Sequence, residues 1–506
     1  KALFFFPVLA GLILQACSGD PIEILSPEQS QFVADDTAGE NILTDNPEDD
    51  VAKATFDRTI RISYSGGSAS VTGGSDDFSV TVDGAGVTVT NNGTEAVIYE
   101  LSGTSPNGWF KLYSTRRQEV LLNGLSLTNP QGAAVNIQSH KRTFVVVSGV
   151  NALADGPSYT QTPSGEDEKA VLFSEGQLVF SGEGSLTVKA TGKAGITSDD
   201  YVRFMEAPSV TVSSSAGHGV RGKEAIIVSD GVIGVDVSGT GKKGFSSDTL
   251  VYFGGGVTTI RTTGSAGTVD DELTGVAGIK ADLRFVMEDG VLTITSTGTG
   301  AKGISGDNVA FFKGGTVTVT ASGANYGSSS SGFGPGGGGG RFGPGGGFST
   351  TDNSVSSKAI KFDGNLYISG GQVKATSAKH EGIEAKGIIQ ITGGEVYSYA
   401  GDDAINAGSD MTISGGAVFA QYDDGGTALA AFRTPSVSNL SLIASAPSLS
   451  NILYGVTVEG GTTCFNGYYT SGATISGGSP CTLSSYSGGS GSGGFGPGGG
   501  AFPGGR

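Results

Sequence analysis

Oxygen-bearing side chains recur at a fixed spacing near residue 400. Glu381, Asp403 and Asp424 are 22 and 21 positions apart, and Glu384 and Asn406 repeat the interval of 22. If the chain folds so that residues one interval apart become neighbours, these carboxylates repel unless a cation compensates them. Ca²⁺ prefers six to eight oxygen ligands. We therefore predict a Ca²⁺ site whose ligands are Glu381, Glu384, Asp402, Asp403, Asn406, Asp423 and Asp424.

The alternative to a calcium site is that Lys379, Lys386 and water neutralise the same acids. Aromatic residues close by suggest a second kind of chemistry, since sugar rings stack on exposed tyrosine faces. We predict ligand contacts from Lys386, Tyr397, Tyr399 and Tyr422, with a structural stacking role as the alternative for each tyrosine. No catalytic residue is assigned.

The same spacing runs through most of the chain as a repeat of a small residue followed by an apolar one. Its unit is about 22 to 25 residues, with two longer intervals that contain insertions. A second landmark in each unit is a glycine followed by alternating β-branched residues, as in Gly315-Thr316-Val317-Thr318-Val319. The apolar anchors of the repeat are Ile196, Val220, Phe245, Ile279, Ile304, Ile360, Ile383 and Ile405.

Alternation with period two predicts β-strands, and glycine at the breaks permits corners between them. One such unit cannot bury its apolar face alone and needs stacked neighbours, which lie about 4.8 Å apart. The prediction is an all-β protein, a right-handed parallel β-helix with a strand-rich cap around residues 60–90 that covers its first edge. A leucine-rich repeat lacks support because its leucine and asparagine pattern is missing, and a β-sandwich would not show the anchors.

The beginning of the chain predicts export. Lys1 precedes a short apolar run, and Leu14-Gln15-Ala16-Cys17 resembles a lipoprotein cleavage site. We predict that residues 1–16 are a signal peptide, that Cys17 carries lipid, and that the protein is attached to the cell envelope as an outer-membrane or surface lipoprotein. An ordinary secretory signal is the alternative.

Composition divides the rest of the chain. Residues 17–55 are acidic, which predicts a flexible tether. We assign residues 56–485 to the β-helix, and residues 327–349 within it to an inserted glycine-rich loop. Residues 486–506 are predicted to form a disordered tail. An oxidising compartment permits a disulfide between Cys464 and Cys481. The net charge of −18 argues against nucleic acid as a partner.

Several segments together resemble a known family. They include His380-Glu381-Gly382-Ile383-Glu384 and Asp402-Asp403-Ala404-Ile405-Asn406, with further segments at 99–104, 121–127, 132–135, 151–156, 169–173 and 181–186. Over residues 85–425 the chain resembles the secreted bacterial carbohydrate-binding β-helix family, whose fold is related to that of pectate lyases. The resemblance implies a right-handed β-helix that binds cellulose-like or acidic polysaccharide and holds Ca²⁺.

Three functions follow as expectations. The first is a non-catalytic, Ca²⁺-dependent surface lipoprotein that binds polygalacturonate or cellulose-like glycans. The second is a polysaccharide lyase, in which Ca²⁺ neutralises the uronate and a lysine acts as base. Candidates for that base are Lys302, Lys358, Lys361 and Lys386. The third is a structural adhesin at the cell surface.

Overall fold

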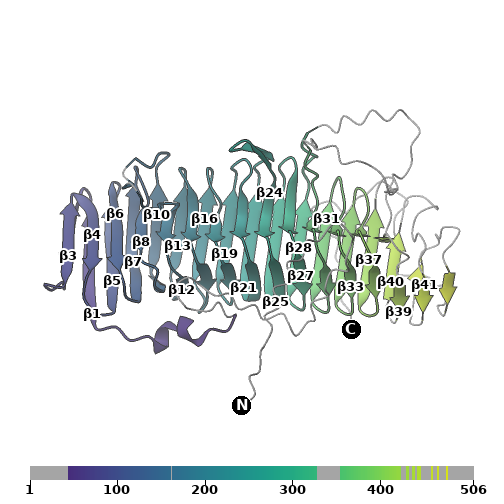
Figure 1. Ribbon diagram of the computed structural model, residues 1–506, viewed down its shortest axis with the longest axis horizontal. Helices are drawn as coiled ribbons and strands as arrows, with labels where there is room; N and C mark the ends of the chain where they lie inside the picture. Colours follow the sequence, from purple (N-terminus) through teal and green to yellow (C-terminus); the bar gives the residue numbers. More distant parts are fainter. Residues whose placement is uncertain are drawn as a thin grey trace, which may run out of the picture.

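The computed structural model describes residues 44–327 except 161 and 164, residues 354–422 and 429–431, and the backbone of five short strands between 436 and 476. Within these residues the chain is built of β-strands, with two short 3-10 helices, η2 (Pro47–Asp49) and η3 (Val51–Lys53). Figure 1 shows the strands as a long stack of coils, with consecutive parts of the sequence following one another along the stack. None of the helices described has the length and apolar character needed to cross a bilayer.

Each coil contributes strands to two large sheets, one of 14 strands and one of 27. The 14-stranded sheet holds the first strand of each coil, and it begins with β3 (Phe78–Asp83), which pairs antiparallel with β4. The following strands of this sheet are parallel: β4 (Ala85–Asn91), β6 (Gly108–Ser114), β8 (Val135–Gln138), β11 (Ala170–Ser174), β14 (Ala194–Ser198), β17 (Val220–Gly222), β20 (Lys243–Ser247), β24 (Val276–Ala281), β26 (Ala301–Gly306), β29 (Ile360–Phe362), β32 (Ile383–Ala385), β35 (Ile405–Ala407) and β38 (Leu429–Ala431).

The 27-stranded sheet holds the second and third strands of the coils. In four coils the second and third strands are continuous. These long strands are β5 (Val97–Ser105), β7 (Gln118–Asn129), β21 (Leu250–Thr262) and β25 (Arg284–Ser296). Strand β1 (Arg58–Ser65) pairs with β5. The separate second strands are β9 (Thr143–Ser148), β12 (Leu178–Ser181), β15 (Tyr201–Phe204), β18 (Ala225–Val228), β27 (Val309–Phe312), β30 (Leu366–Ile368), β33 (Ile389–Ile391), β36 (Met411–Ile413), β39 (Ser436–Ser438), β41 (Thr457–Glu459) and β43 (Thr474–Ser476).

The separate third strands carry the alternating pattern that the sequence shows most clearly. They are β10 (Val150–Asp155), β13 (Ser185–Ala190), β16 (Ser209–Ser214), β19 (Val232–Val237), β28 (Thr316–Ala321), β31 (Gln372–Ser377), β34 (Glu395–Ala400), β37 (Ala417–Tyr422), β40 (Ser441–Ser445) and β42 (Cys464–Phe465). In β28 the inward Val317 and Val319 are fully buried, and Thr316, Thr318 and Thr320, which alternate with them, are partly exposed. Gly315 and Gly371, which precede β28 and β31, have φ values of 68° and 73°, a conformation that glycine adopts without strain.

The predicted anchors stack as expected. Ile196 pairs with Val220, Val220 with Phe245, and so on in parallel register to Ile383 and Ile405, and all eight are fully buried. The stacking also extends upstream of the anchors, because Val87, Phe110, Val135 and Leu172 continue the same column. The all-β class and the parallel stacking of coils are therefore confirmed.

Antiparallel strands occur at the N-terminal end of the stack and in one hairpin. At the end, β2 (Ser68–Thr72) pairs with β1, as β3 does with β4, in the region where the sequence predicts a cap. The hairpin of β22 (Gly267–Val269) and β23 (Glu272–Thr274) projects between β21 and β24. An isolated bridge between Tyr326 and Val355 closes the base of the glycine-rich insertion.

The segment of residues 44–56, which we call the strap, packs against the outer surface of the 27-stranded sheet (Figure 1). Val51, Ala54 and Phe56 contact an apolar cluster there, and the ring of Phe56 meets that of Phe144 edge-on with centroids 6.2 Å apart. The tether predicted for residues 17–55 is corrected at this end, because residues 44–55 are bound to the coils.

Asp49 holds the strap against the coils through a buried group of ion pairs and a hydrogen bond. Its carboxylate is completely buried and accepts from Arg142 at 2.7 Å, from Arg203 at 2.7 Å and from the Tyr201 hydroxyl at 2.6 Å. The two guanidinium groups come from different coils and are themselves 2% and 4% exposed. A buried carboxylate with this many donors is compensated, so the acidic composition of the segment does not keep it in solvent.

Some predictions fall outside the described residues. These are the signal peptide at 1–16, lipidation of Cys17, the ligands Asp423 and Asp424, the tail at 486–506 and the glycine-rich loop beyond Gly327. The disulfide also belongs here, since Cys481 and the side chain of Cys464 are not described.

Candidate functional site

Charged side chains line the outer face of the 14-stranded sheet from β20 to β35. They occupy two columns, two residues before and one residue after each buried anchor, so that equivalent positions on successive coils are neighbours. We call this surface the polar face; its members are Lys243, Lys280, Lys302, Lys358, Lys361, Glu381, Glu384, Asp403 and Asn406.

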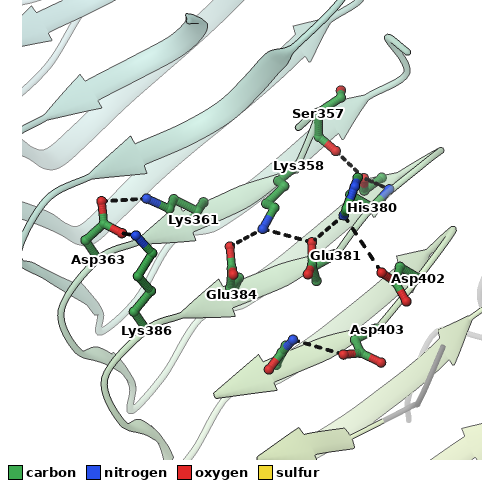
Figure 2. A network of polar contacts seen from close by, with 12 residues as sticks. Ser357, Lys358, Lys361, Asp363, His380, Glu381, Glu384, Lys386, Asp402 and Asp403 are labelled. Atoms are coloured by element: carbon green, nitrogen blue, oxygen red, sulfur yellow. Dashed lines mark hydrogen bonds and ion pairs between the residues drawn. The ribbon is translucent and has the colours of Figure 1, made fainter. Parts of the chain in front are cut away.

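Lys358 neutralises two of the predicted calcium ligands. Its ammonium lies 3.0 Å from a carboxylate oxygen of Glu381 and 2.6 Å from one of Glu384, both on the next coil (Figure 2). All three side chains are between 10% and 15% exposed. Little solvent screens these contacts, so the ammonium provides the charge compensation that was expected from a bound cation.

The ionisation of this cluster follows from its contacts. Burial alone would raise the pKa of Glu381, but the hydrogen bond from His380 and the charge of Lys358 outweigh it and lower that pKa to about 2. For Lys358, burial acts to lower the pKa, and Glu381 with Glu384 reverses the effect and raises it. Glu381 and Lys358 therefore stay charged over the whole physiological pH range.

His380 joins Glu381 to a third group. Its Nδ1 atom lies 3.0 Å from Glu381 and 3.8 Å from Asp402 (Figure 2), and the three residues can offer ligand atoms within 4.8 Å of one another. Burial and the negative charge of Glu381 raise the pKa of Asp402. An imidazole nitrogen with two carboxylates resembles a transition-metal ligand set more than the all-oxygen shell of Ca²⁺.

The structure thus assembles only part of the predicted calcium shell. Glu384 lies in register with Asn406, as expected, but its carboxylate contacts Lys358. Asp403 accepts a hydrogen bond of 2.9 Å from the Asn406 amide. Glu381 and Asp402 come together, and His380 was not among the predicted ligands.

Lys386 lies beside a different acid. Asp363 receives Lys386 and Lys361, each at 2.5 Å (Figure 2). Burial acts to raise the pKa of Asp363, and these two ammonium groups together lower it. Lys386 is therefore part of an ion pair at the corner of the coil, and its predicted role in ligand contact has no support from this geometry.

Of the three tyrosines predicted to contact a ligand, Tyr422 needs correction. Tyr422 is 1% exposed and points into the interior, so it does not present a face to a ligand. Tyr397 lies outside, where its ring stacks on Phe419 with centroids 4.6 Å apart and an angle of 6°. This stacking covers one face of the Tyr397 ring. Tyr399 occupies the next outward position of β34 and is half-buried.

A second group of potential ligands lies near the other end of the stack. Asp167, Glu175 and Asp199 can offer oxygen atoms within 4.8 Å of one another. Lys169 sits among them, 2.7 Å from Asp167 and 2.5 Å from Asp199. Here too a lysine supplies the compensating charge.

Acid titration tests the Glu381 contacts. The carboxyl has a lower pKa in the folded than in the unfolded chain, so its stabilising effect is full above pH 4.5 and is lost as the pH falls towards 2. We expect the loss to be about 3 kcal/mol, measured by denaturant unfolding across this range. Glu381→Gln should remove this part of the pH dependence and the exposed control Glu183→Gln should keep it; parallel curves for all three proteins would contradict the assignment.

The fold and the polar face together define a class, an elongated stack of parallel β-coils that displays an ordered row of charged groups. Comparison with known protein families identifies the family within this class. Residues 83–404 match the model of the carbohydrate-binding domain-containing protein family, and the chain belongs to that family.

A solved structure gives a more distant likeness. It is described as the polysaccharide lyase-like protein from C. thermocellum, in a gadolinium derivative. It is 19% identical, with a TM-score of 0.42 over 50% of this chain and 96% of that one. No curated protein matches this chain.

Proposed function

We propose that the protein binds polysaccharide along the polar face and does not cleave it. The observation that carries the proposal is that every coil from β20 to β35 presents at least one charged side chain in one of the two columns, with coils about 4.8 Å apart, on a member of a carbohydrate-binding family. A polymer of sugars repeats on a similar length scale, so one extended chain can meet equivalent groups on several coils.

The proposal includes the handedness of the coils. Each strand of the 14-stranded sheet from β4 to β35 is followed by a crossover that returns to a parallel strand of the same sheet, one coil further on. Such crossovers are right-handed in about 98% of cases. We therefore propose that the coils form a right-handed parallel β-helix, and that the polar face runs along its axis.

Calcium enters as a cation that bridges protein and ligand. Lys358 already neutralises Glu381 and Glu384, and we propose that Asp402 and Asp403, on the following coil, contribute carboxylate ligands to Ca²⁺ at this end of the polar face. Carboxylates of an acidic glycan would supply further oxygen atoms. Asp423 and Asp424 remain predicted ligands of the same site.

Electrophoresis in gels that contain polysaccharide tests binding and its calcium dependence together. We expect retardation by polygalacturonate, and a several-fold weaker effect after chelation with EDTA that added Ca²⁺ restores. Hydroxyethyl cellulose serves as the neutral comparison and bovine serum albumin as the non-binding protein. Retardation unchanged by EDTA would contradict the role of calcium, whereas no retardation on either polymer would contradict polysaccharide binding and favour a structural adhesin.

Attachment to the cell envelope through Cys17 is proposed from the sequence. A palmitate analogue supplied to cells should label the protein, and Cys17→Ser should abolish the label and release the protein from the membrane fraction. Labelling of the variant at the level of the natural protein would contradict lipidation at this residue.

A lyase remains the second candidate because of one observation. Burial and the neighbouring charges of Lys361 and Lys358 lower the pKa of Lys302 to about 8, close to the range in which a lysine acts as a general base. A lyase would release unsaturated products from pectate, which absorb in the ultraviolet. A rise in absorbance that disappears in Lys302→Met would establish this function; no rise leaves binding as the function.

A further inference from the structure

Most lysines of the polar face have an acidic partner. The ammonium of Lys280 lies 3.0 Å from Asp282 and also contacts Asp307, and that of Lys361 lies 2.5 Å from Asp363. Together with Lys358, these residues need no ligand to balance their charge.

Lys243 and Lys302 differ from the other lysines. Within the part of the chain that the structure describes, neither forms an ion pair, and the Lys243 ammonium donates to the carbonyl oxygen of Gly241 at 2.8 Å. The two residues occupy the same column, since Lys243 is in register with Ala277 and Ala277 with Lys302. They are thus two coils apart, about 10 Å, with only a methyl group between them.

Neighbouring segments limit the solvent around both ammonium groups. A side chain added at Gly275 would meet the Lys302 Nζ atom at 3.7 Å and the Val355 side chain at 3.4 Å, so Lys302 lies close to the base of the insertion. The β22–β23 hairpin approaches Gly241, the acceptor for Lys243, through Val269 and Thr274. Burial is accordingly the main reason that the pKa values of Lys243 and Lys302 fall to about 8.

Withdrawing an ammonium group from water without an opposite charge costs free energy. A residue that only filled space here could be a methionine or leucine, which would avoid that cost. Two uncompensated cations in one column are instead suited to two anions held at a similar spacing, and carboxylates are favoured because a charge-assisted hydrogen bond to an ammonium is strong.

We propose that Lys243 and Lys302 bind two carboxylates of a single acidic polysaccharide chain that lies along the polar face. The inference rests on the proposed function and assigns to these two lysines the recognition of the carboxylates of a uronic-acid polymer. A neutral glucan offers no group that would balance the two charges.

Binding of an oligogalacturonate, measured by calorimetry on the purified protein, tests the proposal. We expect Lys302→Met and Lys243→Met each to weaken binding at least tenfold and the double variant about a hundredfold, consistent with the loss of one charged hydrogen bond per residue. Lys302→Arg should retain most of the affinity. Lys189→Met, which removes an exposed lysine from another sheet, is the matched control and should bind as the natural protein does.

The pH dependence has a defined sign. The lysines must be protonated to bind carboxylates, so affinity for the oligogalacturonate should fall as the pH rises through about 8. The titratable and charged groups that act on Lys243 are Lys242, Lys280, Arg221 and Asp282, with His218 also in contact with its backbone. Those that act on Lys302 are Lys280, Lys358, Lys361 and Glu384. An increase in affinity over this range would contradict the proposal.

Acylation of the natural protein by acetic anhydride gives a readout that does not depend on the folding of a variant. Oligogalacturonate should protect Lys243 and Lys302 from acylation and leave Lys189 unprotected, as identified by peptide mass spectrometry. Unprotected lysines, or Met variants that bind equally well, would overturn the inference. Binding of cello-oligosaccharide but not oligogalacturonate would refute the inference and leave the proposed function standing, whereas binding of neither would refute both.

Discussion

Replacing Asp49 by alanine is expected to lower the free energy of unfolding by about 3–5 kcal/mol. The substitution leaves the guanidinium groups of Arg142 and Arg203 buried without the carboxylate that both contact. Glu48 still reaches Arg142 at 3.1 Å, but its side chain is 65% exposed and offers little compensation. The strap should then detach and expose the apolar cluster under Phe56.

Denaturant unfolding followed by fluorescence of the single tryptophan, together with limited proteolysis of residues 44–56, measures this effect. Asp76→Ala, at an exposed acid, is the control and should change stability by less than about 0.5 kcal/mol. A loss below about 1 kcal/mol in Asp49→Ala, with the strap still resistant to protease, would show that the strap is held by its apolar contacts alone.

Lys358→Met is expected to convert its surroundings into a cation site. Without the ammonium, the carboxylates of Glu381 and Glu384, at the start of β32, lose the charge that compensates both of them. The free energy of unfolding should fall by several kcal/mol in the absence of metal, since two buried carboxylates lose their partner. A divalent cation would restore that compensation, so affinity for Ca²⁺ should rise at least tenfold.

Calorimetric titration with Ca²⁺, and melting curves with and without the ion, measure both effects. Lys313→Met is a suitable control, because Lys313 also contacts a glutamate, Glu288. The side chain of Glu288 is 40% exposed, so solvent can compensate its charge when the lysine is removed. If Ca²⁺ binds to Lys358→Met and to the natural protein with equal affinity, the ammonium does not occupy the place of a cation.

The repeat allowed the sequence to predict the stacking in detail. The predicted register of the anchors from Ile196 to Ile405 is confirmed because each is an apolar residue that follows a small one and recurs at the repeat interval, and burial of one column depends only on that spacing. The vicinity of Glu381 and Glu384 followed from the same register. The ion pairs of these acids with Lys358 could not be predicted in the same way. Lys358 extends to them from the preceding coil, and residue spacing does not show how far a side chain extends.

The burial of Tyr422 could have been predicted from the alternation of apolar residues in its strand. Strand β37 alternates, with Val418, Ala420 and Tyr422 pointing inward and Phe419 outward. Applied to residues 417–422, the period-two rule assigns Tyr422 to the core and Phe419 to the surface beside Tyr397.

The strap was missed for a different reason. Its contacts join Asp49 to residues 93 and 154 positions away, a separation unrelated to the repeat. Acidic composition favours a solvated segment, but tertiary contacts with two buried arginines override that preference. The sequence signal was an arginine between two apolar residues in Val202-Arg203-Phe204, whereas Arg142 lies between the polar residues Lys141 and Thr143 and gave no such signal.

A crystal structure of the protein with a bound oligogalacturonate would test most directly whether the polar face is the glycan-binding surface. We expect the sugar chain to lie along the coil axis over β20 to β32, with carboxylates at Lys243 and Lys302. A chain bound over the strands that carry Tyr397 and Phe419, or across the coils on the side of the strap, would contradict this account.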